Sequence, residues 1–370
     1  MKIALCTDGI FPQAMGGMQR HSRLLAEHLA RAGGVELVVL HPHAAGVFDP
    51  ALGITEVPVA PIDTDKLYLR ELWRYSGRVA KALDRIQPDV VLSQGFCVWK
   101  GGDRFSGRLI VHPHGLEMFQ GLTRKERILG WPFRWALRRI LRKSAACISL
   151  GGKLTGILQQ QVRGTNCQVI VLPNAVDVPA APAPQPAATT PLELLFVGRF
   201  AFNKGIDVLV AVAERLVKEG KGEVVRFSLA GDGPLLAQYQ AKGLPANIRL
   251  LGRVDDAQLQ QLYATCHAFI LPTRFEGMPT VVLEAMAQGR PVFVSDVGAT
   301  AELVGPHNGY LLPPGDGNAL YNAILAFSER KPEVRAKMGR YSFERVQERF
   351  SWPAVTQGFL EVFRKLAKGT

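Results

Sequence analysis

Residues 275–287 have the sequence Phe275-Glu276-Gly277-Met278-Pro279-Thr280-Val281-Val282-Leu283-Glu284-Ala285-Met286-Ala287. The apolar run at residues 268–271 predicts a buried strand, and the apolar side chains after Pro279 recur at helical spacing. Residues 277–279 are therefore predicted to form a strand-to-helix turn. In that turn, the amides of Thr280 and Val281 and the positive end of the helix dipole point at an anion. We expect Glu276 in the turn and Glu284 on the helix to line one ligand site.

Apolar strand candidates alternate with helical patterns along the chain, which predicts parallel sheets covered by helices. The strand candidates are residues 2–6, 35–40, 90–92, 109–111 and 146–150, then 192–197, 226–230, 248–251, 268–271 and 291–295. Proline and alanine dominate residues 177–191, which we expect to be a linker or exposed hinge. The prediction is an α/β chain with two doubly wound domains, residues 1–176 and 192–350, and a terminal amphipathic helix over 351–370.

The composition fits a soluble globular protein of two domains. The chain has 370 residues, of which 47% are hydrophobic and 21% charged. Its five cysteines are scattered, which favours neither a disulfide framework nor a metal cluster. The first strand is interrupted too soon, by Asp8, to be a signal peptide, and no apolar stretch reaches membrane-spanning length. We therefore expect a cytoplasmic protein.

Three further loops that follow predicted strands carry candidate ligand-binding residues. A glycine pair ends at Gly17, where backbone without a side chain comes close to a phosphate. Arg199 and Lys204 combine a fork of donors with a compact charge, which together neutralise a diphosphate without metal. His112 and His114 have no third ligand at suitable spacing, so zinc is not expected. Each pattern alone also fits a tight turn, a solvated loop or a structural histidine; their combination favours a ligand site.

Taken together, these motifs resemble those of the retaining glycosyltransferases of the family 4 type. The resembled signature is a Glu-x7-Glu motif followed by Ala-Met-Ala and a small-residue turn, here Glu276 to Ala287 and then Gly289. Many members have Pro-Phe-Gly after the first glutamate, where this chain has Gly-Met-Pro. The resemblance implies the GT-B fold, in which two Rossmann-like domains face each other across a cleft and a C-terminal helix crosses back to the first domain.

The resemblance also implies roles for individual residues. The residues implied to act on the donor sugar are His114 and Glu276. Those implied to bind the donor diphosphate are Gly17, Arg199, Lys204, Thr280 and Val281. The remaining roles are ribose binding by Glu284, a place beside the base for Arg253, and acceptor contact for Glu117.

The implied activity is retaining, metal-independent transfer of a hexose from a nucleotide diphosphate sugar. A UDP-sugar is favoured over a GDP-sugar, and no cofactor is expected. The expected acceptor is a hydroxyl of a lipid-linked or cell-surface polysaccharide or a glycolipid at the cytoplasmic membrane face. Two alternatives remain open, a UDP-sugar 2-epimerase of the same architecture and a non-catalytic protein that binds a membrane surface.

The formal net charge of +12 is unevenly distributed. Residues 123–143 contain eight lysines and arginines against the single acid Glu126, interleaved with apolar and aromatic residues. A helix with one basic stripe and aromatic residues beside it is typical of proteins that bind an anionic membrane surface. A solvated basic face over core leucines is the alternative, and nucleic acid is disfavoured. The expected membrane-facing residues of this peripheral protein are Arg127, Trp131, Arg134, Trp135, Arg138 and Arg142.

Overall fold

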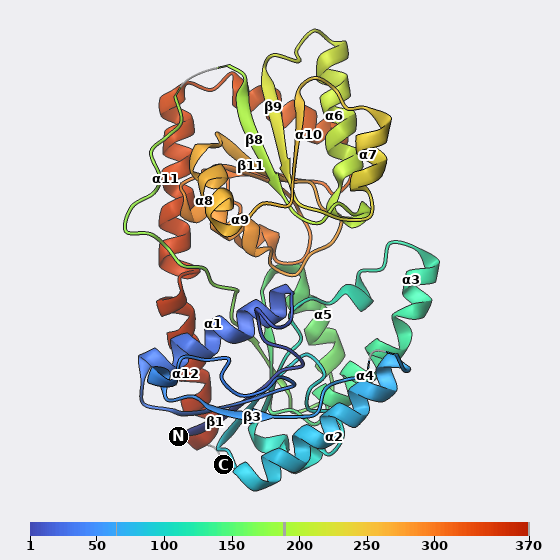
Figure 1. The fold of residues 1–370 in the computed structure, drawn as a ribbon, viewed down its shortest axis with the longest axis vertical. Helices are drawn as coiled ribbons and strands as arrows, with labels where there is room; N and C mark the ends of the chain where they lie inside the picture. The colour runs from blue at the N-terminus through green and yellow to red at the C-terminus, as the bar shows by residue number, and fades with distance from the viewer. Residues whose placement is uncertain (64, 188–189, 369–370) are drawn as a thin grey trace. The chain divides into compact units, whose positions relative to one another are not determined.

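The structure is a computed structural model that describes residues 1–63, 65–187 and 190–368. The chain forms two compact units, which are residues 1–174 with the C-terminal helix (unit 1) and residues 175–351 (unit 2) (Figure 1). Residues 188–189 of the predicted linker and residues 369–370 of the predicted terminal helix lie outside the described residues.

Unit 1 contains a parallel sheet of seven strands. Their order across the sheet is β3 (Thr55–Pro58), β2 (Glu36–His41), β1 (Lys2–Cys6), β4 (Val90–Gln94), β5 (Leu109–His112), β6 (Ala146–Ser149) and β7 (Gln168–Val171). The central strands β1, β4 and β5 are buried almost throughout. Helices cover both faces of such a sheet, which is why these strands are continuous apolar runs in the sequence.

The helices of unit 1 include one from the far end of the chain. They are α1 (Gly17–Ala32), α2 (Tyr68–Ile86), α3 (Arg124–Leu129), α4 (Trp131–Leu141), α5 (Gly152–Val162) and α12 (Trp352–Lys368). The C-terminal helix α12 packs against α1, where the rings of Trp352 and His28 stack at 4.9 Å. None of the helices in the described part of the chain is long and apolar enough to span a membrane.

Unit 2 contains a parallel sheet of six strands. Their order is β10 (Ile248–Gly252), β9 (Val225–Ala230), β8 (Leu192–Val197), β11 (Ala268–Leu271), β12 (Val292–Ser295) and β13 (Gly309–Leu312). The helices are α6 (Ile206–Lys218), α7 (Leu236–Lys242), α8 (Asp256–Thr265), α9 (Thr280–Ala287), α10 (Gly317–Ser328) and α11 (Pro332–Arg349). Helix α6 packs against α10, and α9 packs against α8 and α11 (Figure 1).

Both sheets have the strand order of a doubly wound dinucleotide-binding fold, so the predicted fold class is confirmed. Counted along the chain, the order in each unit begins 3-2-1-4-5-6. In this topology the chain reverses direction across the sheet between the first and fourth strands. Ligands bind outside the carboxyl ends of the strands at that switch point. The switch point lies between β1 and β4 in unit 1 and between β8 and β11 in unit 2.

Three strands were not predicted from the sequence, and all three are edge strands. They are β3, β7 and β13. Their burial is partial, because an edge strand has a neighbour on only one side. Such a strand does not need the continuous apolar run by which the central strands were recognised.

The proline-rich segment before β8 is packed on unit 2. The buried side chain of Arg290, which follows α9, donates from Nη2 to the carbonyl oxygen of Pro184 at 2.9 Å and to that of Ala264 at 2.8 Å. Gln185 donates to the carbonyl oxygen of Gly289 at 3.1 Å. These bonds attach the segment to the loop after the Glu-x7-Glu helix.

Gly205 allows close backbone contact between the loops after β8 and β11. It has φ +71°, and a Cβ added there would lie 1.9 Å from the carbonyl oxygen of Pro272. Gly220 has the same φ of +71° but open space around its Cβ position. We predict that Gly220→Ala lowers the free energy of unfolding by about 1 kcal/mol, the cost of a left-handed alanine. Gly205→Ala should cost roughly 2 kcal/mol more, because a clash adds to that strain. Urea unfolding of both variants measures the difference, and equal losses would contradict the contact.

Candidate active site

The centre of the candidate site in unit 2 is an ion pair between two loops. Lys204 ends the short 3₁₀ helix η4 (Phe202–Lys204) after β8, and Glu276 follows β11. The Lys204 Nζ donates to Glu276 Oε1, and Thr273 Oγ1 donates to the same oxygen at 3.2 Å. Both ionic side chains are mostly buried, with 22% of Lys204 and 12% of Glu276 exposed. The structure therefore brings two predicted site residues together at the switch point of unit 2.

Arg274 fixes the position of the loop that carries Lys204. Its guanidinium donates to both carboxylate oxygens of Asp207, at 2.7 and 2.6 Å. It also donates to the carbonyl oxygen of Phe202 at 2.6 Å and lies 3.9 Å from the centre of that ring. A bidentate arginine–carboxylate pair has a defined geometry. The Arg274–Asp207 pair therefore joins the two loops in addition to the pair between Lys204 and Glu276.

Several donors at this edge have no partner in the part of the chain that the structure describes. Arg199 follows β8, and its exposed guanidinium makes neither a hydrogen bond nor an ion pair there. The amides of Thr280 and Val281, at the start of α9, donate no hydrogen bond to other described residues. Helix α9 has neither an acidic residue in its first turn nor a side-chain cap. Unpaired donors at a helix N-terminus favour an anion.

Glu284 and Arg253 lie beside helix α8. The buried Tyr263 on α8 donates from its hydroxyl to Glu284 Oε2 at 2.9 Å, which orients that carboxylate. Arg253 follows β10 and lines a hollow of about 410 Å³ together with Leu251, Val254, Gln258, Gln261, Leu262 and Thr265. Apolar walls with a few polar groups suit a flat ring such as a nucleobase.

In unit 1, the predicted glycine residue lies at the corresponding switch point. Gly17 is the first residue of α1, which follows β1. A Cβ at Gly17 would meet nothing within 4 Å, and its amide donates no hydrogen bond to other described residues. The neighbouring strand β4 ends at Gln94. An exposed helix N-terminus therefore lies next to a polar side chain at the carboxyl edge of the sheet.

His114 belongs to a cluster of three histidines beside that edge. Its Nε2 lies 2.5 Å from Gln94 Oε1, and its backbone φ is +58°. The His114 ring stacks on His112 with centroids 3.8 Å apart, and His21 packs edge-on against both. Since an amide oxygen only accepts, the contact with Gln94 requires the Nε2–H tautomer of His114. The lone pair of His114 is then on Nδ1.

Burial keeps these three histidines neutral. It lowers the pKa of His21 to about 4. Burial also lowers the pKa values of His112 and His114 well below the usual 6.5, and the neighbouring imidazoles lower them further. A neutral imidazole can exchange a hydrogen bond with a sugar hydroxyl without adding a charge.

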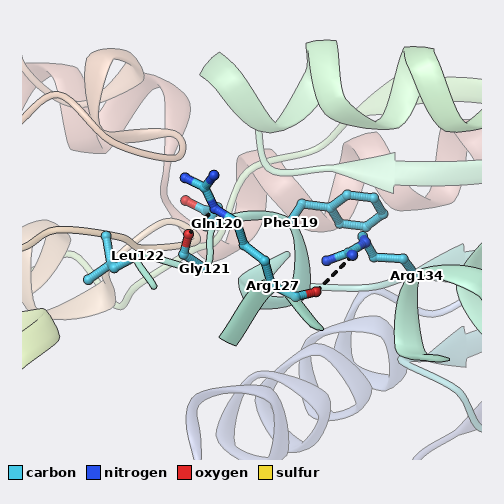
Figure 2. Close-up of a pocket in the computed structure, with 6 residues that line it drawn as sticks. All are labelled: Phe119, Gln120, Gly121, Leu122, Arg127 and Arg134. Atoms are coloured by element: carbon cyan, nitrogen blue, oxygen red, sulfur yellow. Dashed lines mark hydrogen bonds between the residues drawn. The ribbon is translucent and has the colours of Figure 1, made fainter. Parts of the chain in front are cut away.

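Glu117 and the basic segment follow the histidine loop. The exposed Glu117 begins the short 3₁₀ helix η3 (Glu117–Phe119). The expected single helix with one arginine stripe is wrong, because the segment forms two helices, α3 and α4, separated at Gly130. Thr123 and Glu126 form a capping box that starts α3. Between η3, α3 and α4 lies a hollow of about 500 Å³ lined by Phe119, Gln120, Gly121, Leu122, Arg127 and Arg134 (Figure 2).

Several arginines of the expected stripe are used for internal hydrogen bonds. Arg134 donates to the carbonyl oxygens of Met118 at 2.7 Å and Arg127 at 2.8 Å, the latter drawn as a dashed line in Figure 2. Arg127 Nε donates to the carbonyl oxygen of Gly121 at 3.1 Å. Arg138 donates to Gln161 Oε1 at 2.5 Å. Arg127 and Arg134 therefore stabilise the fold of the segment through backbone carbonyls, while Arg138, although bonded to Gln161, is exposed together with Trp131, Trp135 and Arg142.

Sequence reasoning missed the residues that orient the predicted ones. Gln94, Tyr263 and Arg274 each hold a candidate side chain or its loop, as described above. Arg274 precedes Glu276 by two residues, and Asp207 lies in the first turn of the helix after Lys204, so opposite charges on two neighbouring loops were a usable signal. Gln94 and Tyr263 belong to no motif, and only the fold brings them to His114 and Glu284.

Two family models match the two halves of the chain. Residues 15–179 match the model described as "Glycosyltransferase Family 4", and residues 191–330 match "Glycosyl transferases group 1". This chain belongs to the GT-B glycosyltransferases of the family 4 type. Their shared fold accounts for the two doubly wound units and for the position of the Glu-x7-Glu motif after β11 of unit 2.

Known relatives cover the chain from end to end. The chain is 23% identical over 413 aligned residues to a glycogen synthase of Mycobacterium tuberculosis, covering 100% of this chain and 96% of that protein. It is 29% identical over 260 residues to a phosphatidyl-myo-inositol mannosyltransferase of Mycobacterium leprae, covering 68% and 64%. Among solved structures, HepE of Anabaena in complex with UDP-glucose is similar in fold, with a TM-score of 0.72, 18% identity and coverage of 99% and 100%.

The buried histidines predict a loss of stability in mild acid. Their pKa values are lower in the folded chain than in an unfolded one, so the unfolded state binds more protons between the two values. The free energy of unfolding should therefore fall as the pH falls from about 6.5 toward about 4. For His21 alone, such a shift corresponds to roughly 3 kcal/mol.

Calorimetric melting between pH 7 and pH 4.5 measures this loss. His21→Phe keeps a ring but cannot take up a proton, so it should lose markedly less stability over this range. His307→Gln removes an exposed histidine of unit 2 and should follow the wild type. An unchanged pH dependence in His21→Phe would contradict the prediction.

Proposed function

We propose that this glycosyltransferase is a retaining, metal-independent enzyme that transfers a hexose from a nucleotide diphosphate sugar. UDP is the favoured nucleotide, with GDP as the alternative. The acceptor is a hydroxyl of a lipid-linked or cell-surface polysaccharide or of a glycolipid, reached at the cytoplasmic face of the membrane. The structure of HepE with UDP-glucose supports UDP, because that protein has a similar fold. The similarity to a mannosyltransferase that acts on phosphatidyl-myo-inositol supports a lipid acceptor.

One observation carries the proposal, which is the grouping of donors at the switch point of unit 2. Lys204, the guanidinium of Arg199 and the amides of Thr280 and Val281 all lie at the carboxyl edge of β8 and β11. Among these donors, only Lys204 has an ionic partner in the described structure, and that partner is Glu276. Two cations and a helix N-terminus match the negative charge of a diphosphate.

In the proposed mechanism, the protein stabilises the departing diphosphate. Negative charge grows on that group as the bond to the sugar breaks, and donors fixed in advance stabilise it without reorganising. The diphosphate takes over Lys204 from Glu276, which frees the Glu276 carboxylate to accept hydrogen bonds from donor-sugar hydroxyls. For unit 1, the proposed roles are diphosphate binding by the amide of Gly17 and acceptance of a hydrogen bond from a donor-sugar hydroxyl by the neutral imidazole of His114. The departing diphosphate then accepts the proton of the acceptor hydroxyl on the same face, which retains the anomeric configuration.

The nucleoside part is assigned to the region beside α8. Glu284, oriented by Tyr263, accepts hydrogen bonds from ribose hydroxyls, and the hollow with Arg253 receives the base. Glu117, on the exposed turn after the histidine loop, contacts the acceptor. The chemistry of these contacts is that of charge-assisted and neutral hydrogen bonds, and it requires no metal ion.

Calorimetric titration with UDP and with GDP tests the donor site. We expect the wild type to bind one of them. Lys204→Ala should weaken this binding by about tenfold to a hundredfold, because a charge-assisted contact to phosphate is lost. Glu284→Ala should weaken it by about tenfold through the ribose. Lys218→Ala removes an exposed cation of α6 and should bind like the wild type.

Absence of binding by either nucleotide would overturn the donor-site assignment. Equal affinities in all four proteins would overturn the roles of Lys204 and Glu284. With the nucleotide known, the anomeric coupling constant of the product, measured by NMR, reports retention. Release of free sugar without an acceptor would favour an epimerase instead.

A further inference from the structure

A groove between helices α2 and α4 of unit 1 combines three tryptophans with three cations. It has a volume of about 380 Å³ and is lined by Trp73, Trp99, Lys100, Gly101, Trp135, Arg139 and Lys143. Figure 1 shows α2 and α4 in the same part of this unit. Three of the five tryptophans of the chain line this groove, and a fourth, Trp131, precedes Trp135 by four residues on α4. The fifth, Trp352, is buried.

Two of the three cations of the groove lie over indole rings, and the third, Lys143, donates to Asp103 Oδ1 at 3.0 Å. The Lys100 Nζ lies 3.9 Å from the centre of the Trp73 ring, and the Arg139 guanidinium lies 5.1 Å from that of Trp135. Gly77 makes room for the Lys100 side chain, since a Cβ there would lie 2.8 Å from Lys100 Cδ. The rings of Trp99 and Trp135 meet edge to face at 6.3 Å. Cation–π contact orients the charges of Lys100 and Arg139 without neutralising them.

Large apolar side chains are also exposed on α2 and α4 and on the adjoining helix α3. At the start of α2 and on α3 and α4, Leu67 is 77% exposed, Ile128 73% and Trp131 62%. Tyr68 of α2 contacts Phe133 of α4 at 6.2 Å between ring centres, so the two helices form one surface. Soluble surfaces seldom gather so many large apolar side chains.

The chemistry of this surface indicates a lipid bilayer rather than a sugar. A sugar ring stacks on a free indole face, but here cations occupy faces of Trp73 and Trp135. Exposed leucine and isoleucine have no counterpart on a carbohydrate, whereas they insert among acyl chains. Indoles and basic side chains at the headgroup level complete the composition of a membrane-interface surface.

We propose that the α2–α4 groove is a binding site for the phosphate of an anionic phospholipid headgroup. Lys100 and Arg139 contact the phosphate, and Leu67, Ile128 and Trp131 insert beside it. The inference rests on the membrane location proposed above, and it moves the main lipid contact from the arginine stripe to this groove. The stripe arginines Arg127 and Arg134 instead hold backbone carbonyls.

Vesicle sedimentation with the full chain tests the charged part of the site. Vesicles of equal parts phosphatidylglycerol and phosphatidylcholine should bind the wild type, and pure phosphatidylcholine should bind it at least about tenfold more weakly. The double variant Lys100→Gln with Arg139→Gln should lose about tenfold in affinity for the anionic vesicles. The control pair Lys218→Gln with Arg249→Gln, exposed on unit 2, removes the same charge and should lose less than about threefold. Equal losses in the two pairs would mean that net charge alone matters, and would overturn the site.

Tryptophan fluorescence in vesicles that contain brominated phospholipid tests the inserted part. The wild type should be quenched, and Trp73→Phe with Trp135→Phe should reduce the quenched fraction, while the buried Trp352 remains as an unquenched reference. Absence of quenching in the wild type would overturn the proposal. UDP binding is measured on the same proteins and should be unchanged in the groove variants. Absence of UDP binding by the wild type would count against the proposed function. The vesicle measurements would still decide whether the groove binds lipid.

Discussion

The ion pair between Lys204 and Glu276 is the interaction on which the candidate donor site depends. It joins the loops after β8 and β11, the two strands that flank the switch point of unit 2. Both side chains are mostly buried, so neither charge is easily left without a partner. A diphosphate that enters this edge supplies a new partner for Lys204. Glu276 then needs hydroxyl donors, which a sugar provides. In the proposed mechanism, the pair thus links nucleotide binding to recognition of the sugar.

The contacts around the ion pair hold the two loops in place, so that in the proposed mechanism only the partner of Lys204 changes. Arg274 and Asp207 hold the lysine loop in place, and at Gly205 this loop packs closely against the carbonyl of Pro272, directly after β11. In unit 1 a neighbouring side chain also orients a candidate residue, but both groups are neutral. Gln94 orients His114 within a buried histidine cluster. Each unit therefore carries polar groups at the carboxyl edge of its sheet, on loops fixed by neighbouring contacts.

The sequence predicted the fold class and the strands that lie at the two switch points, because central parallel strands are buried on both faces and have continuous apolar runs. It did not predict the edge strands β3, β7 and β13, which lack such runs. It identified Lys204 and Glu276 singly but not their contact, which depends on β8 and β11 being neighbours in the sheet. The basic segment was misjudged because a helical wheel cannot reveal the break at Gly130 or that carbonyl oxygens bind Arg127 and Arg134.

The most direct test of the central claim is a calorimetric titration of UDP into Glu276→Gln. If the diphosphate must take Lys204 from Glu276, removing the negative charge frees Lys204 in advance. UDP should then bind severalfold more tightly than to the wild type, since a partly buried ion pair of about 1 kcal/mol no longer competes. Transfer of sugar from the donor should fall in the same variant. Weaker UDP binding in Glu276→Gln than in the wild type would contradict the account, because Glu276 would then support the nucleotide rather than compete with it.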